Sequence, residues 1–209
     1  MTVAVADERE VVAGALVHMD VEFLTILTTW PDKKPRRYTG MAGVHIVTTE
    51  DKAIFTVTDG RRLARVTAPC ISTTKKLDII LTVGALKSRI NNPHRRSGVN
   101  EINLAGPFAN YELLDTVAFP HAMAIDSTLA ATSTEPWITI SKLSTSALFF
   151  HQALPEVGID TALLKGLPGG MTLNFTAPEE GKGALPTTGS AKGAESDTLN
   201  VAIMPICIQ

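Results

Sequence analysis

The sequence repeats one unit, in which an apolar segment is followed by a small polar residue, a short helix-forming segment and a stop signal. In the first copy, Asp20 lies between ALVHM and VEFLTILTT, and Pro31 follows. The Asp20 carboxylate can accept hydrogen bonds from the free amides of a first helical turn, and proline disfavours helical conformation at the preceding residue. In the second copy, Thr82 precedes VGALKSRI and Pro93 follows it. Each copy therefore predicts a strand that leads into a short capped helix.

Two later copies follow, and the fourth is weaker. Ser141 lies between WITI and KLSTSALFFHQAL, Asp160 precedes TALLKGL, and a proline follows each segment. These copies predict helices at residues 142–154 and 161–167. Short capped helices are common, so chance similarity between the copies remains an alternative on this pattern alone.

The segments between these helices predict antiparallel sheet. Alternating or wholly apolar runs indicate strands at residues 44–47, 53–57, 63–67, 101–104, 111–114, 171–175 and 199–208. Strands outnumber helices and are joined by tight turns, so we expect an α+β fold. Residues 178–197 are rich in Gly, Pro, Ser, Thr and Glu, which predicts a long loop. A change of composition near residues 120–127 suggests two domains, at 1–123 and 124–209.

Composition limits the possible functions. The formal net charge is -2, so a DNA partner would need local basic patches within about 10 Å of its phosphates. Cys70 and Cys207 form neither a disulfide framework nor a metal quartet, and the five histidines lack metal-ligand spacing. A signal peptide and a membrane-spanning run are both missing, so we expect a cytoplasmic protein with no cofactor. No motif indicates an enzyme, and Asp59 in TDGRR is interpreted as a turn residue rather than a catalytic acid.

Residues 56–64 read TVTDGRRLA, which is a strand, a tight Asp-Gly turn, a basic pair and a returning Leu-Ala strand. This motif resembles the signature hairpin in the middle domain of the bacterial DNA polymerase III β sliding clamp, with Arg61 in place of the common histidine. KKLDIILTVGALKSRI and NYELLDTVAFP resemble the segments that follow it, and VAIMPICIQ resembles the terminal strand. The resemblance covers most of residues 11–123 and 159–209. It implies a DNA clamp fold with antiparallel sheets outside, short helices inside and two pseudo-domains.

The chain also departs from the family pattern. It has room for two domains at most, whereas a standard β clamp has three. His121 and Ala122 follow the Phe-Pro turn instead of an acidic residue and a tyrosine, and Cys207 occupies the usual arginine position.

The resemblance implies a surface pocket that takes a short linear peptide from a polymerase, and possible pocket residues follow from the matching motifs. An apolar floor and a polar rim are expected from Thr58, Gly60, Arg61, Arg62, Leu63, Pro120, Ile203, Met204, Pro205 and Ile206. The alternative interpretation makes Ile203 and Ile206 ordinary core residues and Arg62 a solvated surface charge.

The resemblance also implies contact with duplex DNA that does not depend on base sequence. The candidate phosphate-binding residues cluster after predicted helices or lie on them: Lys33, Lys34, Arg36, Arg37, Lys87, Arg89, Arg95, Arg96 and Lys142. The alternative is that these side chains serve only surface solubility.

Two domains per chain favour a homotrimer that closes a six-domain ring, as in two-domain clamps. The expected partners are duplex DNA, a DNA polymerase and a clamp loader, and the short length suggests a phage or mobile-element origin. The alternative is a monomeric, clamp-derived adaptor or decoy that binds partner peptides without encircling DNA. An enzyme on an α+β scaffold is a third hypothesis, for which the sequence offers no motif.

Overall fold

The structure is a computed structural model. It describes residues 14–35, 38–73, 76–92, 97–115, 119, 136–139, 157–158, 161–174, 187–194, 196–204 and 206–207. The helical elements are α1 (Val21–Thr29), η1 (Thr39–Ala42), α2 (Val83–Ser88), η2 (Asn110–Glu112) and η4 (Thr161–Leu164). Within the described ranges, no helix has the length and apolar character needed to cross a membrane.

The strands form one large antiparallel sheet and one small one. The strands are β1 (Ala15–Asp20), β2 (Gly43–Thr48), β3 (Lys52–Thr58), β4 (Arg62–Thr73), β5 (Asp78–Thr82), β6 (Val99–Asn103), β7 (Leu113–Leu114), β8 (Pro136–Thr139), β9 (Val157–Gly158), β10 (Thr172–Asn174), β11 (Thr187–Lys192), β12 (Thr198–Ile203) and β13 (Ile206–Cys207). The large sheet has 11 strands and runs β7-β5-β2-β3-β4-β12-β11-β10-β8, with β1 and β6 branching from it. The predicted α+β fold with antiparallel sheets is confirmed.

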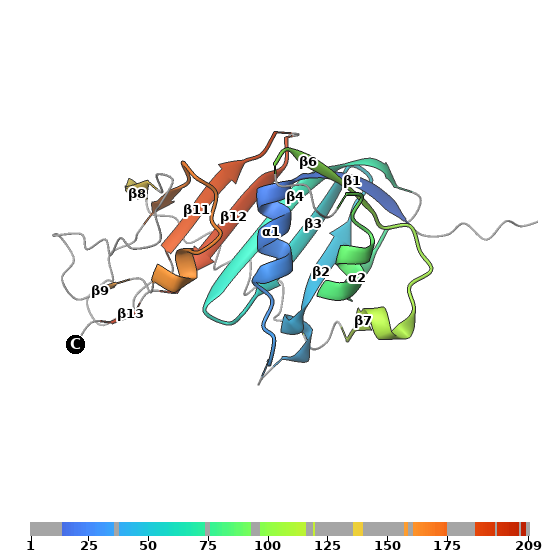
Figure 1. Cartoon of the computed structure of the whole chain (residues 1–209), viewed down its shortest axis with the longest axis horizontal. Helices are drawn as coiled ribbons and strands as arrows, with labels where there is room; N and C mark the ends of the chain where they lie inside the picture. Colours follow the sequence, from blue (N-terminus) through green and yellow to red (C-terminus); the bar gives the residue numbers. More distant parts are fainter. Residues whose placement is uncertain are drawn as a thin grey trace, which may run out of the picture.

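Strand β4 is long enough to have two partners along one edge. Its first half pairs with β12, from Arg62 opposite Ile203 to Thr67 opposite Thr198. Its second half pairs with β1, where Thr73 lies opposite Ala15. The sheet therefore divides at β4 into two parts, the β1–β6 pair and the β12–β11–β10–β8 arm (Figure 1).

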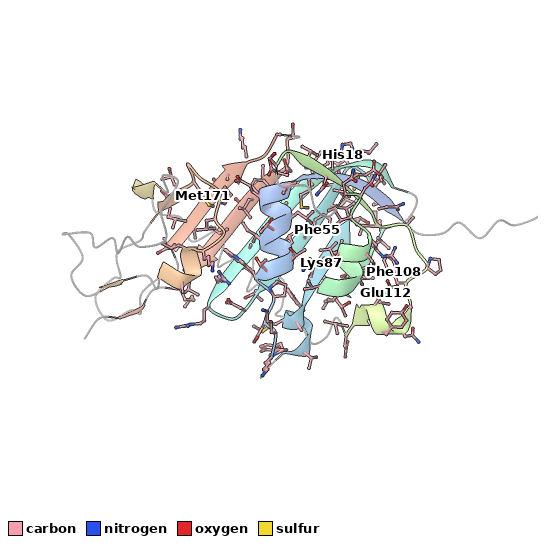
Figure 2. The ribbon with its side chains drawn as sticks, viewed as in Figure 1. His18, Phe55, Lys87, Phe108, Glu112 and Met171 are labelled. Carbon is pink, nitrogen blue, oxygen red and sulfur yellow. The ribbon has the colours of Figure 1, made fainter. Side chains whose placement is uncertain are left out.

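Helices α1 and α2 lie on the same face of the sheet, and the main core lies between them and the strands (Figure 1). Trp30, Leu27 and Ile46 are almost completely buried there, and so is Phe55, which is labelled in Figure 2. Each such side chain contributes roughly 1.5–3 kcal/mol through burial. Apolar burial under the helices therefore sets which face of each strand points inward.

The predicted caps of the first two helices are confirmed, and Ser141 and Asp160 lie outside the described residues. The amide of Glu22 donates to Asp20 Oδ1 at 2.8 Å, and the amide of Ala85 donates to Thr82 Oγ1 at 3.2 Å. Helix α2 ends at Ser88, earlier than predicted, because Ile90 forms a bridge to Ile102 of β6. The helix predicted at 161–167 is the shorter 3-10 helix η4, and the one predicted at 142–154 lies outside the described residues.

Two strand predictions and one loop prediction need correction. The strand predicted at 199–208 is two strands, because β12 ends at Ile203 and β13 pairs with β9 in a separate sheet. The segment predicted as a strand at 111–114 begins as η2, where the Glu112 carboxylate accepts from the Ala109 amide at 2.8 Å.

The third correction concerns the loop predicted at 178–197, because β11 lies within it and joins β10 to β12. The sequence TTGSAK lacks the apolar alternation that signals a strand. Close packing explains why one of these residues is glycine, at position 189. A Cβ at Gly189 would lie 2.7 Å from both Leu173 Cδ2 and Thr172 O, so this strand packs closely only without a side chain there.

Candidate functional site

The β3–β4 turn is held by its own polar side chains. Thr58 Oγ1 donates to the Arg62 carbonyl at 2.8 Å, and Asp59 Oδ1 accepts from the amides of Arg61 and Arg62 at 2.9 and 3.0 Å. Gly60 has φ +85°, a conformation that glycine adopts without strain. The interpretation of Asp59 as a turn residue is confirmed. Thr58, expected on an exposed rim, is 6% exposed and instead holds the turn.

The Arg62 side chain joins this turn to two distant segments. Its Nε donates to Asp59 Oδ2 at 2.9 Å, one terminal nitrogen donates to the Leu163 carbonyl at 3.2 Å, and the guanidinium lies 4.3 Å from the centre of the Trp30 ring. Arg62 was expected on the rim of a pocket, with a solvated surface charge as the alternative. The structure shows neither, because the guanidinium is engaged by three neighbours and the side chain is 15% exposed.

A second apolar cluster lies on the face of the sheet opposite the helices. Leu63, Ile80, Phe119 and Ala202 are buried in it, and Leu114 packs at its edge. Leu63 and Ala202 lie opposite each other on β4 and β12, which are about 140 residues apart in the chain. We call these five residues the outer cluster.

His45 adjoins the outer cluster. Its ring centre lies 5.1 Å from that of Phe119, at an interplanar angle of 47°. Its Nε2 lies 2.8 Å from Asp78 Oδ1, and Asp78 is the first residue of β5. The His45 ring is therefore tilted against Phe119, and Asp78 fixes the orientation of the imidazole.

Met204 connects the end of β12 to the β3–β4 turn. Its amide donates to the Arg61 carbonyl at 2.8 Å, and its side chain is 45% exposed. Ile203, predicted in the pocket floor, is fully buried in the main core on the opposite face. Ala202, which the sequence interpretation missed, takes that place beside Leu63, as the two-residue period of a strand requires.

The remaining predicted pocket residues lie at or beyond the limits of the described structure. Leu63 belongs to the outer cluster, and Gly60 and Arg61 are exposed at the turn. Ile206 lies in β13, whose side chains are not described, and Pro120 and Pro205 lie outside the described residues.

The predicted DNA-binding residues divide into exposed and engaged side chains. Lys33, Lys34 and Lys87 are exposed. Arg89 is not available as predicted, because it donates to the Ala105 carbonyl at 2.7 Å, pairs with Glu112 and lies over the Phe108 ring. Phe108, Glu112 and Lys87 are labelled in Figure 2. The others lie outside the described residues: Arg36, Arg37, Arg95, Arg96 and Lys142.

The exposed side of α1 carries Glu22, Thr25 and Thr29 and no basic residue. Across the described part of the chain, no group of three His, Cys, Asp or Glu side chains is arranged to hold a metal ion. The site therefore offers apolar and hydrogen-bonding contacts, with cations at its margin.

Comparison with solved structures identifies the fold. The β clamp of Helicobacter pylori, solved with 5-chloroisatin, matches 92% of this chain with a TM-score of 0.52 and 12% sequence identity. This chain has the fold of a bacterial β clamp. Clamp structures from Streptococcus pyogenes (14% identity, 90% of this chain, TM-score 0.46) and Thermotoga maritima (13%, 98%, 0.46) are also similar. No protein-family model matches, and no curated protein matches.

The clamp resemblance predicted from sequence motifs is confirmed at the level of the fold. The chain spans 66% of the Helicobacter pylori clamp and 65% of the Streptococcus pyogenes subunit, so it is shorter than either. At these identities the shared feature is the fold, and function has to be argued from this chain's own residues.

Proposed function

We propose that this chain is a non-enzymatic DNA replication accessory of the clamp type, which binds a short linear peptide of a DNA polymerase or clamp loader beside the outer cluster. The hydrogen bond from the Met204 amide to the Arg61 carbonyl carries the proposal. It brings the end of β12 to the β3–β4 turn and leaves the partly exposed Met204 side chain next to them.

Each part of this site suits a peptide ligand. Met204 offers a flexible apolar surface, which adapts to side chains of different shape. Gly60 has no side chain, so an extended backbone can approach the turn closely. Burying one apolar anchor of the peptide would contribute roughly 1.5–3 kcal/mol, which is about a tenfold to hundredfold gain in affinity.

The clamp proposal includes contact with duplex DNA on the helix side of the sheet. Lys87 is exposed on α2 and can approach a phosphate without reading a base. Division of the chain into domains at 1–123 and 124–209, with three copies closing a ring, is the assembly that this proposal requires.

A second candidate is the monomeric adaptor or decoy, and the edges of the described sheet favour it. A ring closed by strand addition needs a free edge on each subunit. Of the described edge strands, β7 has two residues and β8 has four. The outer edge of β6 is already bonded, because Asn91 donates to the Glu101 carbonyl and Asn103 donates to the Arg89 carbonyl.

Light scattering and peptide binding together separate these functions. A mass three times the 22.3 kDa chain mass supports the ring, and a persistent 22.3 kDa species supports the adaptor. The peptide site is tested with Met204→Glu. We expect this substitution to lower the affinity for a fluorescent polymerase-derived peptide at least tenfold, because it removes the exposed apolar anchor.

The matched control is Ile71→Glu, because Ile71 is also an exposed apolar residue, at 55%, but lies in the second half of β4. We expect this variant to bind the peptide like the parent protein. If Met204→Glu binds the peptide as tightly as the parent protein, the proposed peptide site is wrong, whatever mass light scattering gives.

A further inference from the structure

Three segments far apart in the sequence meet at the end of the sheet that carries the β3–β4 turn. Trp30 follows α1 and lies under the Arg62 guanidinium, which also donates to the Leu163 carbonyl of η4 and pairs with Asp59 of the turn. A Cβ at Gly166 would lie 3.8 Å from Trp30 Nε1, so the residues after η4 also border the tryptophan. Figure 1 shows the end of α1, the β3–β4 turn and η4 (orange) along the lower side of the view.

Two exposed apolar residues lie on segments that contact the turn. Met41 Cε lies 3.2 Å from the position that a Cβ at Gly60 would take, and the Met41 amide donates to the carbonyl of Tyr38. Tyr38 is 40% exposed. Met204 is 45% exposed, and its amide donates to the Arg61 carbonyl. Backbone hydrogen bonds therefore join an exposed methionine directly to the turn, and an exposed tyrosine to the Met41 that contacts it.

This end of the sheet is basic, although the whole chain has a net charge of -2. The described segments 30–35, 38–42, 59–63 and 161–166 contain five cationic side chains and two carboxylates. One of each, Arg62 and Asp59, pair with each other at 2.9 Å. Lys33, Lys34 and Lys165 are exposed. We call these three lysines, together with Tyr38, Arg61 and Met204, the turn-end surface.

We propose that the turn-end surface selects an acidic linear peptide. Its apolar anchor would contact Met204 and Tyr38, and its carboxylates would face Lys33, Lys34 and Lys165. This inference rests on the proposed peptide site and adds the charge of the partner. It also assigns Lys33 and Lys34 to binding the peptide instead of DNA, because these lysines lie on the same surface as the turn and Lys87 lies on α2.

The surface favours a peptide over a single-stranded nucleic acid. Binding a flexible strand typically uses several aromatic side chains on which successive bases stack, and Tyr38 is the one exposed aromatic of the turn-end surface. A methionine thioether suits an aliphatic or aromatic peptide side chain. Complementary charge would mainly speed association and would weaken with salt, because screening acts over about 10 Å at 0.1 M.

The test compares two labelled ten-residue peptides that share a Leu-Phe anchor and carry either three glutamates or three glutamines around it. Fluorescence anisotropy gives both affinities across a range of sodium chloride concentrations. We expect the glutamate peptide to bind about tenfold tighter at low salt, from three exposed ion pairs. In the variant K33Q/K34Q/K165Q this advantage disappears and the affinity for the glutamine peptide does not change.

The matched control is K52Q/K76Q/K192Q, which removes the same charge from three exposed lysines at the other end of the strands. We expect it to retain the preference for glutamate. Equal affinity for the two peptides in the parent protein would refute the acidic partner and leave the peptide site standing. Binding of neither peptide would refute the proposed site itself. Tighter binding of a (dT)10 oligonucleotide, lost in K33Q/K34Q/K165Q alone, would replace the peptide by a nucleic acid.

Discussion

Replacement of Arg62 offers the sharpest test of how the β3–β4 turn is held. The substitution Arg62→Ala removes the ion pair to Asp59, the hydrogen bond to the Leu163 carbonyl and the contact with the Trp30 ring. A hydrogen bond from a charged donor contributes about 1.5–3 kcal/mol, and a largely desolvated cation–π contact about 1–2 kcal/mol. These contacts share one group and are not additive, so we expect a loss of about 2–4 kcal/mol.

Urea denaturation measures this loss, and thermal unfolding should show a fall in Tm of about 2–4 °C for each kcal/mol in a chain of this size. Arg62→Lys keeps the charge but lacks the planar guanidinium with its several donors, so we expect its loss of stability to be roughly half as large. Lys87→Gln, on the exposed side of α2, serves as the control and should stay within about 0.5 kcal/mol of the parent. A loss below about 0.5 kcal/mol in Arg62→Ala would refute the role assigned to the guanidinium.

Two further predictions concern packing away from the turn. Gly189→Val should destabilise the protein by about 1–3 kcal/mol in urea denaturation, because its Cβ would overlap Leu173 and the Thr172 carbonyl, whereas Gly84→Val, which has open space around it, should cost under about 1 kcal/mol. Arg89→Gln should speed amide hydrogen exchange at Ala109 and Glu112, because Arg89 holds residues 105–112 through the Ala105 carbonyl and the Glu112 carboxylate. Unchanged exchange at these amides would contradict that role.

Features that depend on local hydrogen bonds could be predicted from the sequence. Asp20 and Thr82 cap their helices because a side chain oxygen reaches amides only two or three residues away. Asp59 and Gly60 form the turn for a similar reason, since the carboxylate bonds amides within three residues and glycine accepts positive φ. The motifs around this turn also predicted the clamp fold.

The exposure of individual side chains could not be predicted from the sequence, because it depends on contacts between distant segments. Arg62 and Arg89 look like surface cations in the sequence, but their acceptors at Leu163 and Ala105 lie 101 and 16 residues further along the chain. Ala202 rather than Ile203 lies beside Leu63, because the face of β12 is set by its register with β4. β11 was missed because its polar residues gain stability only between β10 and β12. Contacts made across the sheet leave no local pattern, so their residues could be assigned only once the strands were paired.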